Sequence, residues 1–415
     1  MNPARIHDGD ILHNLINLPQ LVFEVTDDCN LNCYYCTYGQ LYCGYDERCS
    51  RYLNIHDVKP LIEYLAKLWT KSLPEAKTPV THIGFYGGEP MLNMSFVKEV
   101  ITFFDSLHIQ RRFKYSMTTN AMLLDRHMDY LVEKDFALMI SLDGDRFAHS
   151  YRVDKSGRES YNQVIENIKR LESCYPDYFK KSVNFNAVLH NRNGVQSATD
   201  FIYTSFGKKP RLSELVSIGV RNEKKEEFES IFLSKSQDFK SISESDPVLG
   251  RIFLDNPMIY RSTLYVKNES GNVFKTYNDL LVEKERVHHL PTGTCSPFSI
   301  KMFVTVNGKI LPCEKIPQRY SFGSINDGIL QLDLEAIAKK HNEYLDKVRG
   351  QCDKCSRRQS CIQCVFTIED LASEDCHCAG FMTKEEYSSF CQQSLNYLKQ
   401  RPSLYKTLIT GTEQL

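Results

Sequence analysis

Short apolar segments alternate with amphipathic segments through the first half of the chain. The short segments are rich in β-branched and aromatic residues and end at Gly, Asn or polar turns, as strands do. They predict six strands, at residues 21–26, 81–88, 113–119, 137–144, 182–189 and 214–220. Between them, apolar residues recur at helical spacing over 58–69 and 161–171. This alternation predicts an α/β fold with a parallel sheet.

The strand pattern is compatible with two architectures that have a parallel sheet. One is an open, doubly wound sheet, and the other is a barrel. In both, ligands bind where the carboxyl ends of the strands meet. The segments CNLNCYYC, GGEP, TTN and SLDG all fall at that end of a predicted strand. We therefore expect one ligand site, built from the loops of several strands.

The second half of the chain has a different pattern. Residues 222–290 open with a charged, helix-like segment and show little strand alternation, which indicates a bridging region. The segment KMFVTVNGKILPC then predicts a hairpin, because Asn307 and Gly308 supply the two positive-φ positions of a type I′ turn. Cysteine-dense loops and two short helical patterns follow. The predicted organisation is an N-terminal extension (1–20), a barrel-like domain (21–221), the bridge (222–290), a cysteine-rich domain (291–400) and a tail (401–415).

Composition narrows the class of protein. The 415 residues are 42% hydrophobic and 25% charged, with a formal net charge of −1, as in a globular protein of more than one domain. This charge balance gives no electrostatic footprint for nucleic acid or for an anionic membrane surface. The chain also lacks a membrane-spanning apolar run and a signal peptide. We therefore expect a cytoplasmic protein without nucleic-acid or membrane partners.

The fifteen cysteines are concentrated in two regions, five at 29–49 and nine at 295–391. In a reducing cytoplasm such clusters bind metal or perform redox chemistry more often than they form disulfides. Cys174 stands apart, and we expect it and Cys391 to be buried thiols. For Cys43 and Cys49 we expect structural roles.

The first cluster is a single loop after the first predicted strand. Cys29, Cys33 and Cys36 can converge on one centre, and thiolates hold iron–sulfur clusters or zinc. Zinc would need a fourth ligand, such as Cys43 or a histidine. The spacing Cys-x3-Cys-x2-Cys, with Tyr35 before the last cysteine, resembles the signature of the radical S-adenosylmethionine (SAM) enzymes. That resemblance implies a partial (β/α)6 TIM-like barrel and a [4Fe-4S] cluster that chelates SAM.

Other motifs match that family in chain order. The GGEP motif resembles the segment that binds the methionine amino group, where glycine lets a backbone approach a ligand closely. Later positions resemble the ribose and carboxylate contacts of SAM. The SAM-binding residues so implied are Tyr35, Gly87, Gly88, Glu89, Pro90, Thr119, Asn120, Ser141, Asp143 and Arg152. From the residues alone, GGEP is also compatible with a turn, Ser141 and Asp143 with a helix cap, and Arg152 with a solvated surface position.

The second cysteine cluster resembles the SPASM extension of peptide-modifying radical SAM enzymes, which holds two auxiliary [4Fe-4S] clusters, making three in all. The implied ligands of one are Cys352, Cys355, Cys361 and Cys378, with Cys376 as the alternative to the last. The implied ligands of the other are Cys295, Cys313 and Cys364. Its fourth ligand is His289 or a late cysteine, or the cluster has an open site. The chain departs from the family in having two residues, not three, between Cys361 and Cys364. A zinc-ribbon-like fold is the alternative that the two CxxC pairs permit.

The resemblance implies reductive cleavage of SAM to a 5′-deoxyadenosyl radical, and auxiliary clusters suggest an oxidative outcome. The predicted function is a maturase that oxidatively modifies a ribosomally made peptide, by a thioether or carbon–carbon crosslink. The alternatives are an anaerobic sulfatase maturase that forms formylglycine and a non-catalytic metal-binding scaffold subunit. Glu314 stands where sulfatase maturases have a catalytic Asp, and it is either a base or a solvated side chain.

The implied partners follow from this function. They are a peptide or protein substrate and an electron donor such as flavodoxin or ferredoxin. Only residues 1–20 precede the first predicted strand. We therefore expect leader recognition, if the substrate has a leader, to use a separate protein or the bridge.

Overall fold

The computed structural model describes residues 5–43, 45–71, 80–242, 246–252, 256–269, 290, 292–368, 371, 373, 376–402, 404, 405 and 408. The chain divides into two compact units. The first, which we call the sheet unit, is His7–Ser241 with Cys295–Lys339. The second, the C-terminal unit, comprises the described residues of Met1–Ile6, Ile242–Thr294 and Lys340–Leu415.

One sheet organises the sheet unit. Its strands, in chain order, are β1 Gln20–Glu24, β2 Val80–Tyr86, β3 Arg112–Thr119, β4 Ala137–Ser141, β5 Val183–Leu189, β6 Arg211–Glu214, β7 Met302–Val304, β8 Lys309–Leu311, β9 Gly323–Asn326 and β10 Ile329–Gln331. The order across the sheet is β10-β9-β8-β7-β1-β2-β3-β4-β5-β6. The strands from β7 through β1 to β6 pair in parallel, and β8 to β10 are antiparallel. Six parallel strands in chain order confirm the predicted α/β fold and agree with a partial barrel.

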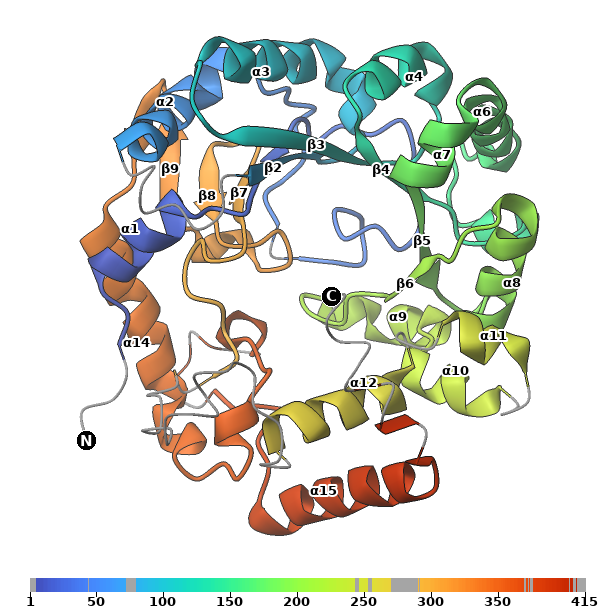
Figure 1. The fold of residues 1–415 in the computed structure, drawn as a ribbon, viewed down its shortest axis with the longest axis vertical. Helices are drawn as coiled ribbons and strands as arrows, with labels where there is room; N and C mark the ends of the chain where they lie inside the picture. Colours follow the sequence, from blue (N-terminus) through green and yellow to red (C-terminus); the bar gives the residue numbers. More distant parts are fainter. Residues whose placement is uncertain are drawn as a thin grey trace. The chain divides into compact units, whose positions relative to one another are not determined.

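Helices cover the outer side of the curved sheet (Figure 1). The α-helices before residue 242 are α1 Asp8–Ile16, α2 Ile55–Lys71, α3 Met94–Ser106, α4 Leu124–Glu133, α5 Arg146–His149, α6 Tyr161–Cys174, α7 Pro176–Ser182, α8 Val195–Phe206, α9 Lys225–Ile231 and α10 Lys235–Ser241. The periodic residues of α2 that predicted it, among them Val58, Leu65 and Trp69, are buried. Apolar burial on one face of each helix thus holds the carboxyl ends of the strands at one edge.

The prediction of the sixth strand was wrong in position. Strand β6 ends at Glu214, where the predicted strand 214–220 begins. The apolar side chains of Leu215, Val216 and Val220 pack instead against residues of the cysteine loop, including Tyr42. The apolar residues of this segment thus belong to a core between two loops and not to a strand.

The predicted hairpin at β7 and β8 is confirmed, but its turn type is wrong. Of the two turn residues, only Gly308 has a positive φ, 75°. The Gly308 amide donates to the Thr305 carbonyl at 2.9 Å, which closes a four-residue turn. The turn therefore spans 305–308, with glycine at its last position, and it joins strands that extend the barrel sheet.

The described part of the C-terminal unit consists of helices and of irregular, cysteine-bearing loops. Its longer helical segments are α11 Pro247–Arg251, α12 Pro257–Leu264, the π-helical turn η5 Tyr265–Glu269 and α15 Lys384–Lys399. Helix α14 Leu334–Cys352 begins in the sheet unit and belongs to the C-terminal unit from Lys340 onward. The helix-like start of the predicted bridge is confirmed as α9 and α10, separated at 232–234. Residues 243–245, 253–255 and 270–289 of the bridge lie outside the described residues.

Candidate functional site

A cavity of about 580 Å³ opens at the carboxyl ends of the parallel strands. It is lined by the cysteine loop after β1, by the loops after β2, β3 and β4, and by residues of β5 and β6. This volume lies within the range of small-molecule sites. The site expected at this edge of the sheet is therefore present as one cavity.

Backbone hydrogen bonds hold the cysteine loop in place. The amides of Asn32 and Tyr34 donate to the carbonyls of Val153 and Tyr151, at 2.7 and 3.0 Å. Within the loop, the Cys36 amide donates to the Cys33 carbonyl at 3.1 Å. The three cysteines are thus fixed by contacts that do not involve their sulfur atoms.

Cys29, Cys33 and Cys36 all line the cavity. Burial raises the pKa of Cys29 to about 11 and that of Cys33 to about 12. Thiolates at this position therefore need a cation to offset the loss of hydration. Among the described residues, no three His, Cys, Asp or Glu side chains are close enough to share a single metal ion. A four-iron cluster binds each cysteine through a different iron, so its ligands stand farther apart, and this donor set fits such a cluster.

Glu89 of the GGEP segment lies at the base of the same cavity, fully buried. Its carboxylate accepts hydrogen bonds from the Thr119 hydroxyl and the Asn120 amide, both at 2.8 Å, and from the Met91 amide at 3.1 Å. Burial nevertheless raises its pKa to about 7. A cationic amine in the cavity would favour the ionised form, so this carboxylate suits an ammonium ligand.

The two glycines of GGEP pack against the cysteine loop. Gly87 has a φ of 133°, and a Cβ on it would collide with the Thr26 carbonyl oxygen. A Cβ on Gly88 would collide with the Asp28 carbonyl oxygen, to which the Glu89 amide donates at 2.9 Å. These positions therefore exclude a side chain because two backbones meet there, which joins the loop after β1 to the loop after β2.

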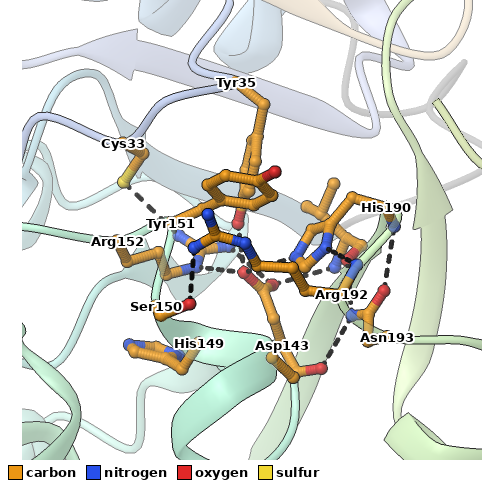
Figure 2. Close-up of polar contacts among 12 residues, drawn as sticks. Cys33, Tyr35, Asp143, His149, Ser150, Tyr151, Arg152, His190, Arg192 and Asn193 are labelled. Carbon is orange, nitrogen blue, oxygen red and sulfur yellow. Dashed lines mark hydrogen bonds and ion pairs between the residues drawn. The ribbon is translucent and has the colours of Figure 1, made fainter. Parts of the chain in front are cut away.

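An ion pair lies beneath the cysteine loop (Figure 2). Asp143 is fully buried, and its carboxylate accepts from the Arg152 guanidinium at 2.8 and 3.0 Å and from the Val188 amide at 3.0 Å. The Tyr35 hydroxyl also donates to it. Although burial opposes ionisation, the guanidinium holds the pKa of Asp143 well below its ordinary range. Figure 2 shows Arg152 between this carboxylate and the Cys33 sulfur, 4.0 Å from its Nη1.

The structure brings most of the predicted SAM-binding residues together. Those that line the cavity are Tyr35, Gly87, Gly88, Glu89, Thr119, Asn120, Ser141 and Arg152. Pro90 and Asp143 are not in its lining: Pro90 begins the short helix η2 Pro90–Asn93, and Asp143 faces Arg152. The direct contacts of Asp143 and Arg152 with SAM stay predictions.

Several residues of the cavity were missed in the sequence. They include Tyr38 and Arg48 from the cysteine loop, Tyr86 at the end of β2, and Asn186 of β5. The last residue or two of each predicted strand would have indicated Tyr86, since ligand sites form there. Arg48 gives no comparable signal, because it lies in an irregular loop.

Glu314 lies outside the lining of the cavity. Its carboxylate pairs with the Lys301 ammonium at 2.8 and 2.9 Å, and the two side chains are 19–20% exposed. Although burial opposes this, the lysine lowers the pKa of Glu314. The neighbouring Cys313 lies 3.6 Å from its Oε2, and burial raises the pKa of that thiol to about 11. Glu314 is thus a partly buried, lysine-paired side chain, and its role as a base stays a prediction.

Four cysteines of the C-terminal unit form a second group. Electrostatic interactions link the buried Cys352 to three further thiols, those of Cys355, Cys361 and Cys378. Burial raises the pKa of Cys352 to about 12. Cys376 is buried as well, but it is not among these partners. The group matches the ligand set predicted for one auxiliary cluster.

The other predicted ligand set is divided between the units. Cys295 and Cys313 belong to the sheet unit and Cys364 to the C-terminal unit, and His289 lies outside the described residues. This set stays a prediction.

The remaining cysteines are mostly exposed. Cys174, predicted to be buried, is exposed at the end of α6, because the apolar face of that helix ends at Leu171. Cys391, also predicted to be buried, is partly buried. Cys43 and Cys49 are exposed as well, and neither lines the cavity.

Comparison with known proteins finds a family model and several relatives that are similar to this chain. Residues 23–194 match the model of the Radical SAM superfamily. The cysteine-type anaerobic sulfatase-maturating enzyme of Clostridium perfringens (strain ATCC 13124) is 23% identical over 393 residues, 89% of this chain and 96% of that enzyme. The radical SAM cyclopropyl synthase TigE of Paramaledivibacter caminithermalis is 22% identical over 315 residues, 73% of this chain and 58% of that protein.

The solved structure of native anSMEcpe with bound AdoMet has the same fold. Its TM-score to this chain is 0.59 at 18% sequence identity, covering 96% of this chain and all of that one. This match confirms the fold class. In the described part of this chain, no helix is both long and apolar enough to cross a membrane.

Proposed function

We propose that this chain, whose residues 23–194 match the Radical SAM superfamily model, is a radical SAM enzyme that matures a ribosomally made peptide by oxidative crosslinking. The observation that carries the proposal is the shared cavity of Cys29, Cys33, Cys36 and Glu89. The three cysteines would hold a [4Fe-4S] cluster, and Glu89 would bind the methionine amine of SAM. When bound, these groups supply one-electron cleavage of SAM followed by hydrogen abstraction from the substrate.

The chain's own residues prepare this site. The backbone bonds of the cysteine loop and the buried pair of Asp143 and Arg152 fix the cysteines before any ligand arrives. The ring of Tyr35 is buried against Tyr151 and is held by its bond to Asp143. A site that is fixed in this way spends little free energy on ordering when it binds its ligands.

The test is cleavage of SAM without substrate. The anaerobically reconstituted chain is incubated with SAM and dithionite, and 5′-deoxyadenosine is measured by chromatography. We expect product from the native chain and none from Cys29→Ala/Cys33→Ala/Cys36→Ala. The matched control is Cys43→Ala/Cys49→Ala, which removes two exposed cysteines of the same stretch and should retain the activity. Equal product from the triple variant would refute the assignment.

Two auxiliary [4Fe-4S] clusters complete the proposal. The group of Cys352, Cys355, Cys361 and Cys378 supports one of them. Three clusters require about twelve irons per chain. An iron count that falls by about four in Cys352→Ala/Cys355→Ala would support this ligand set, and an unchanged count would contradict it.

Formylglycine formation on a sulfatase is the second candidate, favoured by the match to a sulfatase maturase along most of both chains. Mass spectrometry separates the two reactions. A crosslinked precursor peptide loses two hydrogens, whereas a sulfatase-derived peptide exchanges its cysteine sulfur for an aldehyde oxygen. As partners we propose a reduced flavodoxin or ferredoxin and, for a substrate with a leader, a separate leader-recognition protein.

A further inference from the structure

Each cysteine sulfur of the cavity has one side-chain nitrogen beside it. The distances are 3.7 Å from Asn120 Nδ2 to Cys29 Sγ, 4.0 Å from Arg152 Nη1 to Cys33 Sγ and 3.9 Å from Arg48 Nη2 to Cys36 Sγ. All three are within hydrogen-bond range for sulfur acceptors. The three donors come from different parts of the chain, the loop after β3, the segment after α5 and the cysteine loop itself. They differ in the charge that they bring.

Two of these donors contribute little net charge. The amide of Asn120 is neutral, and its nitrogen also donates to Asn30 Oδ1 at 2.8 Å. The guanidinium of Arg152 is paired with the fully buried carboxylate of Asp143, as Figure 2 shows. The charges of this pair therefore largely cancel at the Cys33 sulfur.

Arg48 brings a charge that no ion pair cancels. Among the described residues, no carboxylate lies within ion-pair distance of its guanidinium, and its buried Nε has no hydrogen-bond partner. The guanidinium packs on the ring of Tyr38, 4.5 Å from its centroid. The carboxylate of Glu24 interacts with it electrostatically from farther away, but that carboxylate accepts from the Val306 amide at 3.0 Å and burial raises its pKa.

A positive donor at a cysteine ligand stabilises the reduced cluster, which carries one more negative charge than the oxidised one. We propose that Arg48 sets the reduction potential of the SAM-binding cluster through the sulfur of Cys36. In this role Arg48 acts through the sulfur of Cys36 and is therefore a positioning residue. The inference rests on the proposed function, because it requires a cluster on Cys36.

The test is a redox titration of the full, anaerobically reconstituted chain, followed by electron paramagnetic resonance. The signal that changes on addition of SAM identifies the relevant cluster, and its midpoint potential is then measured without SAM. In Arg48→Gln we expect the ratio of reduced to oxidised cluster at a fixed potential to fall about tenfold, equivalent to about 59 mV for one electron. The matched control is Arg51→Gln, because Arg51 lies on the same loop, donates to Asn307 at 2.9 Å and does not line the cavity.

The outcomes separate this inference from the proposed function. A native chain without a SAM-responsive signal would refute the proposed function itself. A native signal with an unchanged midpoint in an iron-loaded Arg48→Gln would overturn only the role of Arg48. If Arg48→Gln fails to load iron, Arg48→Met decides, because it removes the charge and keeps an apolar stem against the ring of Tyr38. A midpoint below the native value supports the inference, and an unchanged midpoint overturns it.

Discussion

The buried pair of Asp143 and Arg152 should dominate the stability of the cysteine site. Asp143 has no exposed surface and Arg152 is 7% exposed, so removing either partner leaves the other charge buried and unpaired. Breaking such a pair costs about 3–5 kcal/mol. We therefore expect Asp143→Asn and Arg152→Gln each to lower the free energy of unfolding by about that amount.

The double variant provides the decisive comparison. Asp143→Asn/Arg152→Gln removes both charges at once, so its cost should fall clearly below the sum of the two single costs. The assay is urea unfolding of the iron-free chain under anaerobic, reducing conditions. The single tryptophan, Trp69, is buried in α2, so its fluorescence follows the sheet unit alone. Single costs below about 1 kcal/mol, or strictly additive costs, would refute the reasoning.

Three further changes test other parts of the site. The pKa of the buried Glu89 is about 7 rather than 4.5, so its contribution to stability is full below pH 4.5 and is lost as pH rises through 7. Across that range the iron-free chain should lose about 3 kcal/mol relative to Glu89→Gln in urea titrations, and parallel curves would contradict this. Gly88→Ala should unfold the site or prevent iron loading, because its Cβ would meet a backbone oxygen, whereas Gly9→Ala, with open space around its Cβ, should load iron normally. Lys301→Met should raise the pKa of Glu314 and move the acidic limb of the pH–rate profile upward, and an unmoved limb would exclude Glu314 as the base.

The elements that were predicted correctly are those whose own residues carry the signal. Strands β1 to β5 are buried apolar segments with polar ends, and α2 has one apolar stripe, so the residues along each element carry its signal. The strand prediction at residues 214–220 failed because an apolar segment can be buried by a loop as well as by a neighbouring strand. Here the burying partner is the cysteine loop, which no local pattern reveals.

The residues of the candidate site also fall into those that the sequence predicted and those that it did not. The cysteines and GGEP were found because spacing within one loop is a local property of the sequence. The partner of Arg152 and the position of Arg48 depend on contacts between distant loops, and the sequence alone does not define those contacts. The same holds for the pairing of Glu314 with Lys301, which joins residues on either side of a hairpin.

The structure also changes the reason for the GGEP glycines. The sequence suggests that glycine admits a ligand, yet the atoms that a Cβ would meet at Gly87 and Gly88 belong to the backbone at Thr26 and Asp28. Close backbone packing thus brings the loop after β2 against the cysteine loop, which places the carboxylate of Glu89 in the same cavity as the sulfur atoms. Cysteine spacing alone would not produce this arrangement, because it fixes only one of the two loops. A substitution at either glycine should therefore impair cluster and SAM binding together, since both depend on the distance between these loops.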